Sequence, residues 1–298
     1  MFSMDTIWIL IIGSLVAASC ALVGCFLVLR KLSMLGDAIS HAVLPGIVIA
    51  FMLTGSRNTL PMLVGAMATG MLAALLTDVL NRFGKLQSDA AIGVTFTWLF
   101  AIGVILVSKF TGMVDLDVEC VLYGEIIFAP LDTVSWGGYN LGPRAAWLAG
   151  PVCLANLLFV ALCYKQLKIC AFDAALAASI GINVALWHYL LMGFVSLTTV
   201  ASFESVGAIL VVAMLTVPPN TAYLLTDRLS HMIAIAVAVG ILSAIGGYLL
   251  ATWLDGAVAG AIAVVSGGFY LLAALFGPRH GVLPRYLAQR RIGRESAV

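Results

Sequence analysis

The sequence contains few charged residues: Asp, Glu, Lys and Arg make up 10% of its 298 residues, whereas 62% are hydrophobic. Soluble domains usually contain about 25% charged residues. This shortage excludes a soluble globular protein, and the charges are too few and too scattered to form a basic face for nucleic acid. The six cysteines occur without a CxxC or zinc-type spacing, which argues against disulfides and against a thiolate metal site.

A nucleotide-binding loop is also absent. No GxxxxGK[ST] segment occurs in the chain, and in that motif backbone N–H groups and a lysine hold the nucleotide phosphates. We therefore expect any ATP hydrolysis to take place on a separate ATPase subunit. We expect that this chain is not an enzyme and that it holds no permanently bound cofactor.

Long apolar runs recur along the chain, and a membrane-spanning helix needs about 20 such residues. The runs predict an all-α, polytopic transmembrane helical bundle of about eight or nine spans. The bundle forms a single transmembrane domain over residues 1–276, followed by a basic tail at 277–298. The predicted spans are residues 6–29, 38–54, 60–80, 90–108, 145–163, 183–201, 204–225, 232–252 and 257–276.

The positions of Lys and Arg predict the orientation, because short cytoplasmic loops carry an excess of these residues. With the N-terminus outside, the outer loops contain only Arg57, Lys109 and Arg144 of the 15 Lys and Arg residues. We therefore predict an outer N-terminus and a cytoplasmic C-terminus. The basic tail would then lie close to anionic headgroups of the membrane lipid.

Two connections between the predicted spans are unusually long. The outer one is either a solvated acidic loop or an electrostatic funnel that concentrates cations. It runs from Lys109 to Arg144 and contains Asp115, Asp117, Glu119, Glu125 and Asp132. The inner one, about residues 165–182, is too apolar for a disordered loop and too polar for a span. We predict there a short amphipathic helix on the cytoplasmic face, from near Asp173 to Gly181.

Two acidic residues, Asp37 and Glu204, fall at membrane depth, where ionisable side chains are rare and usually functional. In the segment LGDAISHAVLPG, Asp37 and His41 are four residues apart and share one helical face. Counted from Lys31 at 1.5 Å per residue, Asp37 lies roughly 9 Å and His41 roughly 15 Å into an apolar layer about 30 Å thick. Transporter sites are found at this depth.

A carboxylate oxygen and a neutral imidazole nitrogen one helical turn apart suit a divalent transition ion such as Mn²⁺, Fe²⁺ or Zn²⁺. Two ligands do not complete a coordination shell. Two other roles for Asp37 and His41 stay open: they hydrogen-bond to each other and stabilise the bundle, or they form a proton relay.

Glu204 lies where the chain is expected to reverse, because spans 183–201 and 204–225 are together too long for one membrane helix. It is either an acid in the first turn of the following helix, favoured by the helix dipole, or part of an outer gate or metal path. Pro218 and Pro219 are expected to interrupt that helix, as a break that lines a pathway or as a plain kink.

Three segments resemble the membrane permeases of bacterial ABC-type manganese, zinc and iron importers: GDAISHAVLPGI, AFDAALAASIGIN and FESVGAILVVAMLTVPPNTAYLLTDR. The similarity extends over essentially the whole chain. It implies a type II ABC importer-like permease in the bacterial cytoplasmic (inner) membrane, which imports a divalent metal by ATP-driven alternating access. The segment VLYGEIIF with Glu125, and the Pro218–Pro219 pair, resemble the subgroup that joins a second, different permease in manganese/iron systems. Mn²⁺ is therefore the expected substrate, with Zn²⁺ and Fe²⁺ as alternatives.

The resemblance also implies partners and residue roles. The permease pairs with itself or with a sister permease, and a separate extracytoplasmic metal-binding protein delivers the ion. Cytoplasmic ATP-binding subunits bind a coupling helix, here the segment around Asp173, Ala177 and Gly181. Asp37 and His41 are implied to bind or gate the metal.

An alternative is a stand-alone secondary, proton-coupled cation transporter that uses Asp37, His41 and Glu204 as a relay. Such a carrier has no need of a helix that binds an ATPase. The amphipathic cytoplasmic segment and co-purification with an ATPase therefore discriminate between the two functions.

Overall fold

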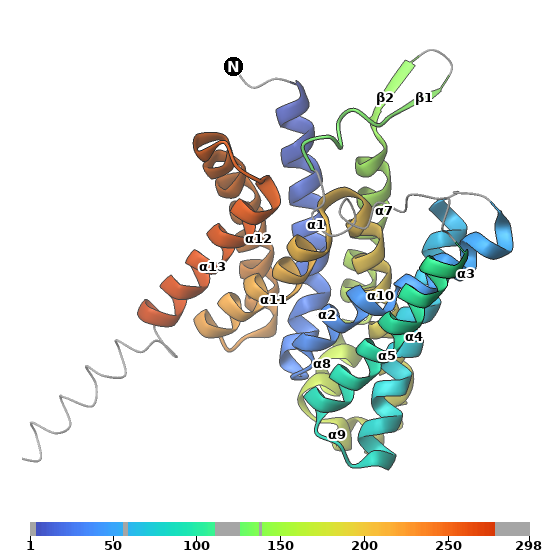
Figure 1. Cartoon of the computed structure of the whole chain (residues 1–298). Coiled ribbons are helices and arrows are strands. Elements are labelled where there is room, and N and C mark those ends of the chain that lie inside the picture. Colours follow the sequence, from blue (N-terminus) through green and yellow to red (C-terminus); the bar gives the residue numbers. More distant parts are fainter. Residues whose placement is uncertain (1–3, 56–58, 111–125, 137–138, 278–298) are drawn as a thin grey trace, which may run out of the picture.

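The computed structural model describes residues 4–55, 59–110, 126–136 and 139–277, and over these ranges the chain is almost entirely helical (Figure 1). The helices are α1 Met4–Leu29, α2 Ser33–Ala42, α3 Leu44–Thr54, α4 Thr59–Gly84, α5 Ser88–Phe110, α7 Arg144–Leu162, α8 Tyr164–Phe172, α9 Ala174–Ser179, α10 Val184–Val206, α11 Ala208–Leu225, α12 Leu229–Leu254 and α13 Val258–Phe276. The strands are β1 Thr133–Trp136 and β2 Tyr139–Pro143. Within the described ranges, nine helical segments are long and apolar enough to span a membrane, which confirms the predicted all-α, multi-span bundle. The predicted basic tail lies outside the described residues, apart from Gly277.

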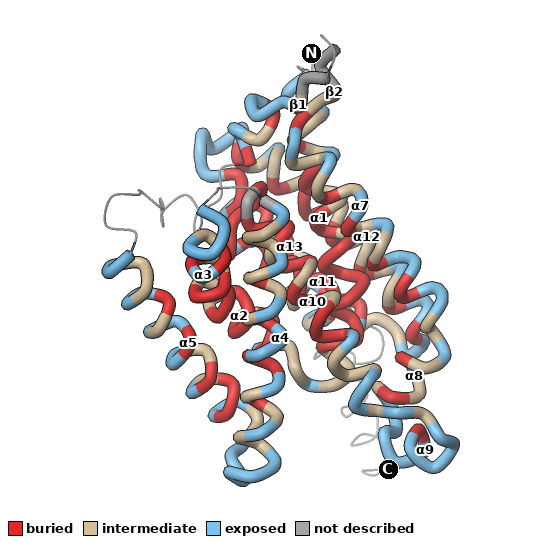
Figure 2. Tube along the Cα trace, turned by 90° about the vertical axis from the view of Figure 1, so that its right-hand side faces the viewer, coloured by how far each residue is buried: buried red, intermediate tan, exposed pale blue. Residues whose placement is uncertain are grey.

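The central helix is α1. In its most apolar stretch, 72% of the residues are buried, a larger share than in any other span. It packs against α7, α10, α11 and α12, and a helix that is apolar all round is expected to be enclosed in this way. In Figure 1, α11, α12 and α13 lie on one side of α1, and α2 to α5 lie on the other. Figure 2 shows buried residues concentrated along α1 and α11.

The bundle has two distinct ends (Figure 1). The end where α1 begins carries β1 and β2 and is called the hairpin end. The opposite end carries the short helices α8 and α9 and is called the α9 end. The position of a residue in a span is described by the end toward which it lies.

The hairpin replaces part of the predicted acidic connection. β1 and β2 pair antiparallel, with a register shift between Thr133 and Ser135. Asp132 lies just before β1, and its Oδ2 is 4.0 Å from Nη1 of Arg144, so the charge of this acid is balanced nearby. The other acids of the connection, Asp115, Asp117, Glu119 and Glu125, lie outside the described residues. A cation funnel at this end therefore stays a prediction.

Glycines let the helices approach closely at two places. A Cβ on Gly24 of α1 would collide with the carbonyl oxygen of Leu215 in α11. Pro219, four residues after Leu215, has no N–H, so this carbonyl lacks its helical donor and the backbone of α1 covers it instead. A Cβ on Gly46 of α3 would likewise collide with the carbonyl oxygen of Gly65 in α4. Such contacts between small residues hold membrane helices together where lipid supplies no hydrophobic drive.

A buried amide adds a polar link between three helices. Asn156 of α7 is fully buried. Its Nδ2 donates to Oγ of Ser19 in α1 at 2.6 Å and to Oγ1 of Thr198 in α10 at 2.7 Å. Hydrogen bonds of this kind fix the relative positions of α1, α7 and α10 without placing a charge in the core.

The prediction that Pro218 and Pro219 break their span is wrong, and the alternative of a plain kink stays a prediction. α11 continues as a helix from Ala208 to Leu225 with both prolines inside it. Both rings are buried, and the neighbouring helices hold the α11 backbone in place although two of its amide donors are missing.

We predict that Gly46→Ala lowers the free energy of unfolding by about 1–3 kcal/mol, because the added methyl group must displace the backbone of α4. The matched control is Gly93→Ala in α5, where a Cβ would meet no atom within 4 Å. Thermal unfolding of the two purified variants measures the difference. Equal melting temperatures for the two would contradict the tight contact between α3 and α4.

Candidate functional site

The second span is interrupted at a single residue near its middle, Val43, which keeps right-handed helical backbone angles (φ −75°, ψ −19°). It extends from Ser33 to Thr54, but α2 ends at Ala42 and α3 begins at Leu44. The predicted span, 38–54, therefore began too late and missed the break. Pro45 is the physical cause, because it has no N–H and leaves the carbonyl of His41, four residues earlier, without a helical donor. Helices interrupted inside a membrane protein are common where a substrate path passes.

Asp37 and His41 lie on one face of α2, as predicted. Oδ1 of Asp37 is 3.7 Å from Nε2 of His41, which is longer than a hydrogen bond. The two atoms are close enough to bind one ion, since ligands that are each about 2.0–2.2 Å from a metal can stand up to about 4.4 Å apart. The Asp37 side chain is 45% exposed and that of His41 is 34% exposed. The pair therefore faces outward from this single chain.

A cavity of about 570 Å³ adjoins His41 on the side of the hairpin end. Its other walls include Phe96, Phe100 and Val104 of α5, and Phe203 of α10. The ring centroids of Phe96 and Phe100 are 5.9 Å and 5.8 Å from that of the imidazole. These rings limit the rotation of the imidazole and keep the surroundings apolar, which strengthens its interaction with an ion. Asp37 lies one turn further toward the α9 end, so the cavity, His41 and Asp37 follow one another along the span.

Glu204 is placed differently from the first-turn position that was expected. α10 continues to Val206 and the chain turns at Gly207, which has φ 79°. Glu204 is therefore in the last turn of α10, and the interpretation that it favours the start of the next helix is wrong. Phe203 and Ala208, on either side of it in sequence, both line the cavity next to His41. The side chain of Glu204 lies outside the described part of the structure, so its role on a metal path stays a prediction.

In the described part of the chain, no further His, Cys, Asp or Glu side chain joins Asp37 and His41 in a group of three or more that could hold a metal. The pair therefore offers one oxygen and one nitrogen from this chain. A bound ion would need its remaining ligands from water, from backbone carbonyls such as that of His41, or from another chain.

The predicted amphipathic segment forms two short helices, α8 and α9. Asp173 caps α9, because its Oδ1 accepts a hydrogen bond from the N–H of Leu176 at 2.9 Å, and Gly181 ends the segment with φ 85°. Ala177 is fully buried, so it packs α9 against the rest of this chain. Leu176 and Ile180, which the sequence reasoning did not single out, are 52% and 56% exposed. They form an apolar surface on α9 that is available to a partner.

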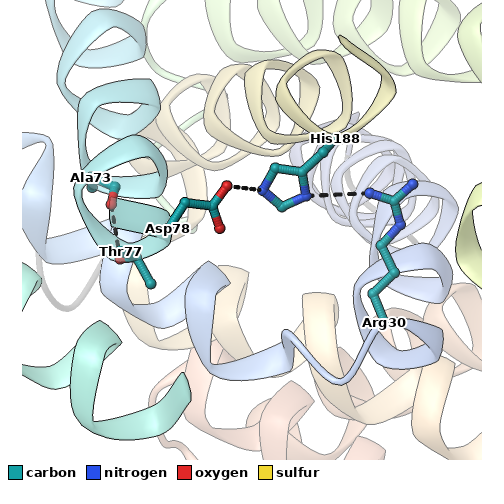
Figure 3. A network of polar contacts seen from close by, with 5 residues as sticks. All are labelled: Arg30, Ala73, Thr77, Asp78 and His188. Atoms are coloured by element: carbon teal, nitrogen blue, oxygen red, sulfur yellow. Dashed lines mark hydrogen bonds and ion pairs between the residues drawn. The ribbon is translucent and has the colours of Figure 1, made fainter. Parts of the chain in front are cut away.

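A polar chain at the α9 end was also missed (Figure 3). His188 of α10 lies between Arg30, just after α1, and Asp78 of α4. Burial lowers the pKa of the Arg30 guanidinium, because it disfavours the charged form. The local sequence gives no sign of this cluster, since Arg30 and His188 are 158 residues apart.

Comparisons with known proteins agree with this architecture. Residues 4–277 match the ABC 3 transport family. The chain is 51% identical to the manganese transport system membrane protein MntD of Bacillus subtilis (strain 168), over 97% of this chain and 98% of MntD. It is 43% identical to the zinc transport system membrane protein TroD of Treponema pallidum (strain Nichols), over 96% of this chain and 78% of TroD. Among solved structures it resembles a chain of PsaBC from Streptococcus pneumoniae in complex with Fab, with a TM-score of 0.79 and 32% identity over 97% of this chain and 96% of that chain.

These matches cover almost the whole chain, and they confirm the resemblance carried by the three sequence motifs. The nine apolar helical segments of the described residues agree with a multi-pass membrane protein. The chain belongs to the ABC 3 transport family and is a permease of the manganese, zinc and iron importer family.

Proposed function

We propose that this chain is the permease subunit of an ATP-driven importer that moves a divalent transition metal into the cytoplasm. The observation that carries the proposal is the pair formed by Oδ1 of Asp37 and Nε2 of His41, 3.7 Å apart beside a break in a membrane span. Mn²⁺ is the foremost substrate, and Zn²⁺ and Fe²⁺ are alternatives. The higher identity to a protein named for manganese than to one named for zinc favours this order.

The ligand chemistry supports a transition metal. Mg²⁺ and Ca²⁺ prefer oxygen ligands alone, whereas a carboxylate with an imidazole suits Mn²⁺, Fe²⁺ and Zn²⁺. The distance of 3.7 Å exceeds a hydrogen bond, which weakens the alternative that the pair serves only to stabilise the bundle. Two ligands from this chain would hold an ion weakly enough to release it, as transport requires.

The order of features along the span supports a direction of movement. We assign the hairpin end to the outside and the α9 end to the cytoplasm, because the Lys and Arg residues of the connections gather at the α9 end. An ion delivered by a metal-binding protein at the hairpin end would pass along the cavity to His41 and then to Asp37. Among the described side chains that line the cavity, none is charged, so His41 would be the first of them to bind the ion.

Two further subunits complete the proposed transporter. Asp37 and His41 are partly exposed in the single chain, and an ionised group that faced lipid at this depth would be strongly unfavourable. A second permease, either a sister chain or another copy of this one, would cover that face and enclose the path. Cytoplasmic ATPase subunits would bind the apolar surface of Leu176 and Ile180 on α9 and drive alternating access.

The alternative of a stand-alone proton-coupled carrier has less support. Two large apolar side chains exposed on α9 are readily explained by a protein partner. A stand-alone carrier has no ATPase subunit that could cover these two side chains. The geometry therefore favours the ATP-driven importer.

We predict that Asp37→Asn and His41→Ala each reduce metal accumulation by at least about 10–100-fold, the loss usual for a residue that only supports a metal ligand. Uptake of Mn²⁺, Zn²⁺ and Fe²⁺ into vesicles that contain the complete transporter, at matched protein abundance, measures the effect and identifies the substrate. Asp255→Asn and His231→Ala are matched controls, since both residues are exposed and Asn readily adopts the left-handed conformation of Asp255. Normal uptake by the Asp37 and His41 variants would contradict the metal site.

We also predict that Ile180→Asp and Leu176→Asp abolish co-purification of the ATPase while the permease stays folded. Each change places a charge in the apolar surface that the ATPase would bury, and an unpaired buried charge weakens an interface strongly. The same change at exposed Leu131, near the hairpin end, is the control and leaves the complex intact. Retention of the ATPase by both α9 variants would mean that α9 is not its binding site.

A further inference from the structure

Arg30, His188 and Asp78 connect three helices at the α9 end, and they are separate from the pair at Asp37 and His41. Nη1 of Arg30 lies 3.3 Å from Nδ1 of His188, and Nε2 of the same ring lies 3.2 Å from Oδ2 of Asp78. Figure 3 shows the imidazole standing between the guanidinium and the carboxylate. A guanidinium can only donate, so Nδ1 accepts and the proton of the neutral ring is assigned to Nε2, facing Asp78.

The bonding of this cluster is incomplete. Within the described part of the chain, Nε and Nη2 of Arg30 are buried without a hydrogen-bond partner, and Nε2 of His188 has no well-aligned hydrogen bond although Asp78 is near. Buried donors of a charged group that lack partners are unfavourable. A guanidinium binds best to a carboxylate directly, through two parallel N–H groups. The carboxylate of Asp78 lies on the opposite side of the imidazole ring from Arg30 (Figure 3).

A second arrangement would remove this deficit. If the ring of His188 withdrew, Arg30 could pair directly with Asp78. Arg82 and Tyr189 also lie next to the Asp78 carboxylate, so Asp78 keeps partners in both arrangements. Cys170 is the other titratable group beside Arg30. In the second arrangement, Arg30 would pair with Asp78 directly after the ring had moved aside and the ends of α1 and α4 had come closer together.

His188 is closely connected to the segment that would bind the ATPase. Gly181 ends α9, and Asn183 caps α10 by accepting a hydrogen bond from the N–H of Leu186 at 3.1 Å. His188 is five residues after Asn183, about 7.5 Å along the helix. A displacement of α9 is therefore passed to His188 through a short linker and one rigid turn of helix.

Arg30, on the other side of the cluster, is connected along the chain to the metal pair of Asp37 and His41. Arg30 lies in the link between α1 and α2, seven residues before Asp37. A change in the partner of Arg30 would therefore act at the base of the helix that carries Asp37 and His41.

We propose that His188 is a movable spacer between Arg30 and Asp78, which couples the movement of α9 to the position of α2. This inference rests on the proposed function. His188 touches no metal; it is a positioning residue. When α10 shifts, the ring is inserted or withdrawn, and the cytoplasmic ends of α1 and α4 move apart or together.

The test uses vesicles that contain the complete transporter, with Mn²⁺ accumulation as the readout. His188→Ala removes the spacer and lets Arg30 pair permanently with Asp78, so we expect uptake to fall about tenfold, within the roughly 5–150-fold range of coupling between sites. His188→Gln keeps an acceptor for Arg30 and a donor for Asp78 and should retain most of the uptake. His231→Ala, an exposed histidine at the start of α12, is the control and should be unaffected.

The decisive variant is the double change His188→Ala with Asp78→Asn. It breaks the direct ion pair, so the proposal expects uptake several-fold higher than with His188→Ala alone. Such a recovery is a non-additive effect that a purely structural role would not give. A double variant no better than His188→Ala, or normal uptake by His188→Ala, would overturn the proposal.

A second measurement keeps the test valid if His188→Ala does not assemble. Cysteines in place of the exposed residues Lys31 and Val79, with Arg30, Asp78 and His188 retained, report the approach of α1 and α4 through a short bifunctional cross-linker. The yield should differ between nucleotide-free transporter and transporter trapped with ATP and vanadate; equal yields refute the movement. Failure of the proposed function is distinguishable from failure of the spacer proposal, because the wild-type vesicles would then accumulate none of the three metals.

Discussion

An ionisable side chain inside a membrane must face something other than lipid, and this constraint governs the arrangement around Asp37 and His41. The two side chains are one helical turn apart on α2, at a distance that one ion can bridge. They remain partly exposed in the single chain. The break at Val43, the cavity on one side of His41 and the exposed face on the other are consistent with a path that is enclosed only when a second permease is present.

The rest of the bundle holds α2 and α3 in position. α1 is enclosed by its neighbours, and Gly24 lets it approach α11 where Pro219 has left a carbonyl of α11 without a donor. Gly46 and Gly65 bring α3 against α4 directly after the break. Rigid packing of this kind allows a movement at one end of a helix to reach the other. The polar cluster of Arg30, His188 and Asp78 lies between α9, where an ATPase would act, and α2, where the metal would bind.

Much of the fold could be predicted from the sequence, because the length of an apolar run reports directly on a membrane span. The spacing of Asp37 and His41 also predicted their shared face. The break in the second span was missed although Pro45 marked it, and the turn before α11 was placed too early because Gly207, not Glu204, ends α10. The exposed apolar side chains of α9 and the cluster around His188 could not be found, since both depend on packing between segments that are far apart in sequence.

The central claim is that His41 and Asp37 together bind the transported ion. Pulsed electron paramagnetic resonance of Mn²⁺ bound to the purified transporter tests it most directly, because it detects a nitrogen nucleus bonded to the metal. The account predicts coupling to imidazole nitrogen in the wild-type protein, and a smaller nitrogen coupling in His41→Ala. A Mn²⁺ signal with oxygen ligands alone in the wild-type protein, or a nitrogen coupling that is unchanged in His41→Ala, would contradict it.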